Sequence, residues 1–469
     1  MSFLTRRIAI DREADHTGSG LKPTLGWPHL VALGVGAIVG TGIYTLTGVG
    51  AGMAGPGVLL SFAIAGAVCA AAALCYAEMA TLMPRAGSAY TYSYAVMGET
   101  VAWVVGWSLI LEYTLVCAAV SVGWSGYAAG LIRDLVPGFP EALLNGPHMP
   151  GGLVNLPAVV IALAVGGLLS LGTRESAIVN FILVLVKLTA LAGFVILAVP
   201  AFNPEHFQPF SPFGWASLGP NDVKLGILPA ASLIFFAFYG FDAISTAAEE
   251  AKNPKRDLTI GIVGSMVLCT VIYMVVAAAA IGASAPAEFS RSTEPLAFVM
   301  KSLGHDSAAW AIALAAVIAM PTVIMVFMYG QSRVFFAMAR DGLLPKVLSK
   351  VSARFGTPVL VTMFTATIAA LIGGFLTLKE IAELANAGTL AAFIAVALSM
   401  IILRVQQPAR PRRFKTPLWW LVGPLAIVGC GYLFWNLPLK TQIWFIYWNL
   451  GGLALYLLWA RTQSNLAKL

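Results

Sequence analysis

Long apolar runs alternate with short polar segments along almost the whole chain. Each run is long enough to cross roughly 30 Å of hydrocarbon as a helix. The twelve runs cover residues 27–52, 57–82, 98–129, 153–172, 176–199, 226–248, 259–283, 307–337, 357–377, 385–404, 417–437 and 442–461. This pattern predicts an all-α integral membrane protein with twelve transmembrane helices.

Glycine interrupts two of these runs. The stretch Gly-Thr-Gly at 40–42 breaks the first run, and Tyr-Gly-Phe at 239–241 breaks the sixth. Unwound backbone in hydrocarbon is costly, so it is kept where it lines a cavity or meets a ligand. A pair of broken helices in corresponding halves of a chain indicates a transporter site.

The glycines of the first run also allow a structural interpretation. Gly36 and Gly40 have the small-x-x-x-small spacing of closely packed membrane helices. Thr41, between two glycines, favours the break, because a half-helix beginning there offers free N–H groups and a hydroxyl to a carboxylate.

Composition supports the membrane class. Hydrophobic residues make up 59% of the chain, charged residues only 10%, and the mean hydropathy is +0.84. A soluble domain has roughly a quarter of charged residues. Residues 1–26 are polar and precede a run too long for a signal-peptide core, so no cleavable signal is expected.

Positive charge predicts the orientation. With both termini in the cytoplasm, the cytoplasmic segments hold 21 of the 28 Lys and Arg residues, the outer segments hold six, and Lys187 lies within a run. This excess follows the positive-inside rule. The net charge of +7 therefore reflects topology and contact with anionic lipid, and no nucleic-acid partner is expected.

The chain lacks the motifs of a metalloprotein or hydrolase. The five cysteines fall inside predicted helices without a Cys-x-x-Cys pair, and the five histidines are not at ligand spacing. No H-E-x-x-H, G-x-S-x-G or Walker A run occurs. We therefore expect no cofactor, no metal and no enzymatic activity.

Two ionisable residues lie near the middle of predicted helices. Glu112 is in the third run and Lys187 in the fifth. Such residues are costly unless they pair or face a cavity, so a functional role is the first interpretation. The alternative for Glu112 is a structural hydrogen bond to a neighbouring helix.

A family resemblance becomes visible around the second and third runs. Residues 76–99 contain Tyr-Ala-Glu…Pro-x-x-Gly-x-x-Tyr-x-Tyr…Gly-Glu, which is similar to the pattern of the amino acid, polyamine and organocation (APC) transporter superfamily. Residues 241–254 and 329–345 resemble its cationic amino acid transporter branch. The likeness covers nearly all of residues 27–461.

The resemblance implies a LeuT-type 5+5 inverted repeat of helices 1–5 and 6–10, with discontinuous helices 1 and 6. It divides the chain into a cytoplasmic N-terminal tail (1–26), a ten-helix transport core (27–404), appended helices 11 and 12 (405–461) and a cytoplasmic C-terminal tail (462–469). The breaks at 40–42 and 239–241 place one broken segment in each half, as such a repeat requires.

The resemblance also implies a substrate site at the breaks. Thr41 and Gly42 are expected to hold the substrate carboxylate, in agreement with the partial positive charge of a half-helix N-terminus. Backbone carbonyls are expected to accept hydrogen bonds from the ammonium, and they belong to Ile38, Phe236, Ala237 and Tyr239.

Side chains around this site are expected to set gating and specificity. Phe236 closes over the substrate from outside, and Asp242 orders the broken segment or interacts with basic groups. Glu112 attracts a cationic side chain if it reaches the pocket. Met325 and Met328 of helix 8 are bulky, which favours a small neutral substrate.

Lys187 matches a position where a cation sits between helices 1, 5 and 8 in sodium-coupled relatives of this fold, and a lysine takes its place in proton-coupled members. The resemblance therefore implies proton coupling through Lys187. The alternative is a permanent ion pair, or an amine hydrogen-bonded to carbonyls of helix 1.

Charges on two cytoplasmic segments are candidates for an inner salt-bridge gate. The alternative is that they are solvated loop charges, which contribute little to stability. The residues concerned are Glu249, Glu250, Lys252, Lys255, Arg256 and Asp257 in one segment, and Arg333, Arg340, Asp341 and Lys346 in the other.

These features together predict secondary active transport of L-amino acids, cationic (arginine, lysine) and/or small neutral (alanine), by proton-coupled symport with alternating access in the cell (inner) membrane. The alternatives are a proton-independent exchanger or facilitator, and a non-transporting amino acid receptor. Expected partners are the L-amino acid, protons and membrane lipid, with a small single-helix subunit as a further candidate.

Overall fold

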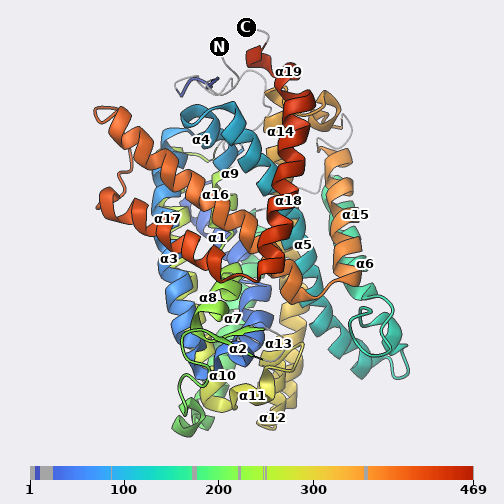
Figure 1. Ribbon diagram of the computed structural model, residues 1–469. Coiled ribbons are helices and arrows are strands. Elements are labelled where there is room, and N and C mark those ends of the chain that lie inside the picture. Colours follow the sequence, from blue (N-terminus) through green and yellow to red (C-terminus); the bar gives the residue numbers. More distant parts are fainter. Residues whose placement is uncertain are drawn as a thin grey trace.

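A computed structural model describes residues 6–10, 25–85, 87–171, 177–219, 223–246, 248, 251–352 and 357–467. The described part is a bundle of helices (Figure 1). Its small antiparallel sheet pairs β1 (Ser217–Leu218) with β2 (Lys224–Leu225), in the register Ser217↔Leu225.

Helical structure lies within each of the predicted ranges. The first half contains α1 (Trp27–Ile38), α2 (Thr47–Ala54), α3 (Val58–Leu82), α4 (Ala89–Val96), α5 (Glu99–Leu135), α6 (Leu156–Ser170) and α7 (Ala177–Ala198). The second half contains α8 (Ile227–Ile234), α9 (Phe241–Thr246), α10 (Pro254–Ala283), α11 (Pro286–Phe289), α12 (Pro295–Ser302), α13 (Asp306–Ala319), α14 (Pro321–Arg340), α15 (Val359–Phe375), α16 (Leu378–Gln406), α17 (Trp419–Asn436), α18 (Leu439–Leu455) and α19 (Arg461–Gln463).

Eight helical stretches among the described residues are long and apolar enough to cross a membrane, and α6 and α15 are shorter apolar helices. The helical class is therefore confirmed, and the lengths of these helices agree with a membrane protein. The number of twelve crossings, the inverted repeat and the division into domains stay predictions.

Local sequence explains where several helices begin. Thr377 accepts the N–H of Glu380, and the Glu380 carboxylate accepts the N–H of Thr377, which forms a capping box at the start of α16. Asn155 caps α6 by accepting the N–H of Ala158. Pro254 opens α10 at a position where its missing N–H has no helical partner to lose.

The core lies between helices that are distant in sequence. α10 packs against α1 and α3, α14 and α16 pack against α5, and α15 packs against α6. α17 and α18 contact α16 from outside these pairs (Figure 1). α1 also contacts α7 and α14, and the turns beside the two breaks, Gly42–Leu46 and Phe235–Ala237, contact each other.

Both ends of the described chain lie at one end of the bundle (Figure 1). Arg6 Nη1 donates to the carbonyl of Arg461 at 3.1 Å. This agrees with both termini lying on one side of the membrane, and the side itself stays a prediction.

Candidate functional site

Both predicted interruptions are present. α1 ends at Ile38, Val39 and Gly40 are non-helical, and the chain continues in a π-helical turn, Gly42–Leu46, before α2. α8 passes into a 3-10 turn, Phe235–Ala237, and helical structure resumes at α9. The glycines therefore mark two discontinuous helices, and each break begins one residue earlier than predicted.

The two breaks touch each other, and glycine is required at the contacts. A Cβ atom on Gly42 would overlap Ala237. Gly240 has a φ of +127°, and a Cβ there would lie 3.1 Å from the carbonyl carbon of Ala37. A side chain at either position would push the half-helices apart.

A cavity of about 10 Å³ lies where the breaks cross, and this volume suits about one water molecule. In this structure the space is therefore too small for a solute larger than water. The lining residues are Ala37, Ile38, Gly40, Thr41, Gly42, Val116, Val120, Phe236, Tyr239, Val323 and Phe327.

Most of the predicted substrate residues are brought together at this cavity. Ile38, Thr41, Gly42, Phe236 and Tyr239 all line it. Ala237 lies behind Gly42 as its packing partner. The breaks thus gather residues that are about 200 positions apart in the sequence.

Helix α14 contributes different residues from those expected. Met325 and Met328 are buried but do not line the cavity, whereas Val323 and Phe327 do. Val323 and Phe327 are four residues apart and share a helix face, whereas Met328 lies on the next face. The methionines were expected at the cavity because of their size. The rotation of α14 about its axis decides which of its side chains reach the cavity.

Two hydroxyls lie at the cavity. Thr41 Oγ1 is buried and has no hydrogen-bond partner among the described residues, whereas the buried Tyr239 hydroxyl lies beside Thr389. A buried polar atom without a partner costs about 1–3 kcal/mol. A polar ligand that bonds to the Thr41 hydroxyl removes that cost.

Protein donors already bind two carbonyls that the first break frees. Tyr273 Oη donates to Ile38 O at 2.6 Å, and Lys187 Nζ donates to Gly36 O at 2.8 Å. A carbonyl oxygen has two lone pairs, so Ile38 retains a second acceptor site for an ammonium.

Lys187 joins three helices. It is fully buried in α7, and its Nζ also donates to Thr322 Oγ1 of α14 at 2.8 Å. The Thr322 hydroxyl in turn donates to Ala319 O at 2.7 Å. The amine therefore lies between helices α1, α7 and α14, which correspond to predicted helices 1, 5 and 8. The hydrogen bond to Gly36 is the contact that the structural alternative expected, and proton transfer by this amine stays a prediction.

Asp242 holds the second break in shape. Its carboxylate accepts the N–H of Gly240 at 2.9 Å and the hydroxyl of Tyr113 at 2.8 Å. Of the two roles predicted for Asp242, these contacts support the ordering of the broken segment.

Glu112 is buried away from the cavity. It lies one turn before Val116 in α5 and faces α16, where a Cβ on Gly388 would lie 3.2 Å from Glu112 Cβ. Thr389 of α16 lies beside the Glu112 carboxylate. Glu112 thus does not line this cavity, and its attraction of a cationic substrate side chain stays a prediction.

Aromatic rings close the cavity on one side. Phe236 and Tyr239 pack edge to face with ring centroids 5.0 Å apart, and Tyr239 meets Phe327 in the same way at 6.1 Å. Both arrangements are favourable for aromatic pairs. The position of Phe236 is compatible with its predicted role as a gate.

The predicted inner salt-bridge gate is only partly described. Glu249 and Glu250 lie outside the described residues. Asp341 accepts a hydrogen bond from Tyr90 Oη at 2.8 Å, and the guanidinium of Arg333 lies 2.9 Å from the ring centroid of Tyr329. The gate stays a prediction.

Comparisons with known proteins agree with this geometry. A family model described as amino acid permease matches residues 25–456. The chain is 45% identical over 449 residues to the branched-chain amino acid permease BcaP of Bacillus subtilis, covering 95% of each chain. It is 38% identical over 471 residues to the methylthioribose transporter of the same organism, covering 100% of each chain. It is also 38% identical over 411 residues to the vacuolar cationic amino acid transporter 2 of Arabidopsis thaliana, which covers 86% of this chain and 64% of the relative.

Proposed function

Because the chain belongs to the amino acid permease family, we propose that it carries L-amino acids across the cell membrane by alternating access. Membership confirms the resemblance to the APC superfamily that residues 76–99 indicated. The proposal includes twelve crossings in a LeuT-type arrangement with both termini in the cytoplasm.

One observation carries the proposal: the two broken helices cross at a cavity that contains the unpaired hydroxyl of Thr41. Backbone N–H groups at the start of the turn after Thr41, together with its hydroxyl, suit a carboxylate. Carbonyls at the ends of α1 and α8 suit an ammonium, because half-helix C-termini carry partial negative charge. In this proposal Ile38, Phe236, Ala237 and Tyr239 supply those carbonyls.

The walls favour an apolar substrate side chain. Val116, Val120, Val323 and Phe327 line the cavity from α5 and α14. A site of this kind binds aliphatic groups, whereas a cationic group needs a carboxylate within reach. The relative at 45% identity is named a branched-chain amino acid permease, which agrees with this chemistry. We therefore infer a preference for leucine, isoleucine and valine, with alanine and arginine as the competing substrates.

Lys187 is the proposed coupling group. Its amine donates to Gly36 of broken helix α1 and to Thr322 of α14. Loss of its proton removes the positive charge and weakens both charge-assisted bonds, and so loosens a contact between helices that must separate in the transport cycle. A proton taken from the outside would then be carried inward with the substrate.

Uptake by purified protein in liposomes tests the proposal. Radiolabelled leucine, alanine and arginine are compared with and without an inward proton gradient, and with an uncoupler. Gradient-driven leucine uptake is expected. Equal uptake in all conditions would indicate an exchanger or facilitator, and binding without uptake would indicate a receptor.

The full-length similarity to a methylthioribose transporter supports a second candidate substrate. Methylthioribose has neither ammonium nor carboxylate, so it cannot satisfy the charged ends of both breaks. Excess methylthioribose is therefore expected to leave leucine uptake unchanged, and strong competition would favour the sugar.

A further inference from the structure

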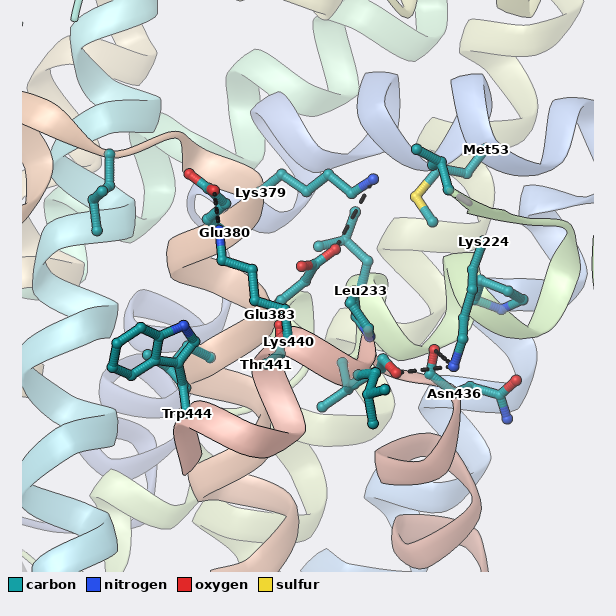
Figure 2. A pocket seen from close by; sticks show the side chains of 17 residues that line it. Met53, Lys224, Leu233, Lys379, Glu380, Glu383, Asn436, Lys440, Thr441 and Trp444 are labelled. Carbon is teal, nitrogen blue, oxygen red and sulfur yellow. Dashed lines mark hydrogen bonds and ion pairs between the residues drawn. The ribbon is translucent and has the colours of Figure 1, made fainter. Parts of the chain in front are cut away.

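A second and larger cavity, of about 730 Å³, lies at the start of α16 and the connection between α17 and α18 (Figure 2). Pockets for small molecules have volumes of about 300–1,000 Å³. We call this cavity the outer pocket, defined by Leu233, Lys379, Glu380, Glu383, Leu384 and Trp444 among its lining residues. It does not share a lining residue with the cavity at the breaks.

The outer pocket continues the substrate cavity along one helix. Pro229 and Leu233 line the outer pocket, and Phe236 lines the cavity at the breaks. Spacings of four and three residues place all three on one face of this helical segment. Asn386 donates to the carbonyl of Leu233 at 3.1 Å and thereby ties α16 to α8 beside both sites. A solute in the outer pocket is thus one to two helical turns from the substrate cavity.

The charges of the outer pocket are of both signs. Lys379 Nζ lies 4.0 Å from Glu383 Oε1, and Lys440 Nζ lies 3.4 Å from Glu380 Oε1 (Figure 2). The Lys440 and Glu380 side chains are 74% and 47% exposed, whereas the Glu383 side chain is only 8% exposed. The Lys440–Glu380 pair therefore lies at the mouth. We call Lys379 and Glu383 the inner pair, in which Lys379 is 36% exposed and Glu383 reaches inward.

The inner pair is loosely held and has apolar neighbours. A separation of 4.0 Å is the outer limit of an ion pair, so both groups can exchange partners at low cost. Leu233, Leu384 and Trp444 provide the apolar surface beside them. A carboxylate, an ammonium group and an apolar surface in one pocket match the three parts of an apolar amino acid.

We propose that the outer pocket is a loading site, which binds an incoming zwitterionic amino acid before it enters the cavity at the breaks. The inference rests on the proposed function. Glu383 accepts hydrogen bonds from the substrate ammonium, Lys379 binds the carboxylate, and the side chain lies on Leu233 and Leu384. The lysine–glutamate pair re-forms when the substrate moves inward.

Protection of an introduced thiol tests direct binding. Leu439 lines the outer pocket and is 67% exposed, and the five native cysteines are buried. A Leu439→Cys protein is labelled from outside with a membrane-impermeant thiol reagent at increasing leucine concentrations. The experiment is repeated with Gly42→Leu, which fills the cavity at the breaks because a side chain at 42 overlaps Ala237.

Leucine is expected to protect the thiol in both backgrounds. Glu383→Gln is expected to raise the half-protecting concentration about tenfold or more, because a bond to a charged group is lost. Glu205→Gln, a change in an exposed carboxylate outside the pocket, serves as the charge control and leaves protection unchanged. Protection that disappears with Gly42→Leu overturns the proposal, since it then reports a conformational change. Absence of protection also overturns it, and leaves the transport proposal intact if leucine uptake persists.

A second pair of variants does not depend on the folding of Gly42→Leu. Leu384→Trp fills the outer pocket, whereas Leu371→Trp places the same ring on the exposed face of α15. The first is expected to lower leucine uptake at subsaturating concentration about fivefold or more, within the range of overpacking effects, while the second leaves it unchanged. Equal uptake by both variants overturns the loading site. Absence of uptake in the wild-type protein contradicts the proposed function instead.

Discussion

Lys187 Nζ donates a 2.8 Å hydrogen bond to the carbonyl oxygen of Gly36, and so a lysine of α7 occupies an acceptor in the broken helix α1. In a continuous helix this carbonyl would accept the N–H of Gly40. The break and the buried amine are therefore parts of one arrangement. A change in the charge or the position of the amine therefore acts directly on the shape of α1.

Lys187→Ala is expected to abolish gradient-driven leucine uptake while exchange of leucine across the same liposomes persists. The amine is the proposed proton carrier, whereas exchange needs only the substrate site. Thr322→Val removes one acceptor of the amine and keeps the bond to Gly36, so it serves as the milder control. Uptake by Lys187→Ala that still follows the proton gradient would falsify coupling through this residue.

Gly42→Ala is expected to reduce leucine uptake strongly. Its Cβ overlaps Ala237, and overpacking of this kind costs about 1–3 kcal/mol, equivalent to roughly fivefold to more than a hundredfold in binding. Gly264→Ala is the matched control, because a Cβ there would meet Val31 at an ordinary 3.7 Å. Similar uptake by the two variants would show that the breaks do not need this close contact.

Tyr113→Phe tests whether Asp242 acts by ordering the second break. It removes a 2.8 Å hydrogen bond to the carboxylate, which is worth about 1.5–3 kcal/mol, and is expected to lower both thermal stability and leucine affinity. Asp242→Ala also frees the N–H of Gly240 and is expected to have the larger effect. The measurement is thermal unfolding with and without leucine. Equal stabilisation by leucine in all three proteins contradicts a link between this carboxylate and the site.

Much of the site could be predicted from the sequence, because glycine in an apolar run has a physical consequence that does not depend on the rest of the fold. The stretches at 40–42 and 239–241 located both breaks, and Lys187 was recognisable as a charge in hydrocarbon. The sequence did not show which face of α14 lines the cavity, because the apolar part of this helix has no polar stripe to mark that face. Met328 was therefore expected at the cavity where the structure has Phe327. The outer pocket was not expected, because helices far apart in the chain form it together.

Val323→Ala is expected to change specificity. The Val323 side chain lines the cavity and lies against Gly40, where a Cβ would be 2.8 Å from its Cγ2. Removal of two methyl groups enlarges the site, so uptake of phenylalanine relative to valine is expected to rise about tenfold, given the roughly 1–3 kcal/mol per methylene in such pockets. Competition by a series of apolar amino acids measures the change. Ile318→Ala, on the exposed surface of α13, is the size control. An unchanged order of competition places the substrate side chain elsewhere.

Glu99 is expected to be a main determinant of stability at the end of the bundle where the termini meet. Its buried carboxylate accepts hydrogen bonds from the hydroxyls of Tyr94 and Tyr456, both at 2.9 Å, and from that of Ser464 at 2.5 Å. Arg6 adds an ion pair at 3.5 Å.

Glu99→Ala leaves these donors without their shared acceptor. Loss of one member of a buried charged network costs about 3–5 kcal/mol, so a clear fall in the unfolding temperature in detergent is expected. Glu141→Ala removes an exposed carboxylate that pairs with Arg133, and solvated pairs of this kind contribute little to stability. The Glu141 variant therefore serves as the matched control and is expected to unfold like the wild-type protein. If both variants unfold at the same temperature, Glu99 does not fasten the termini to α5, and the contacts of Tyr456 and Ser464 contribute no measurable stability.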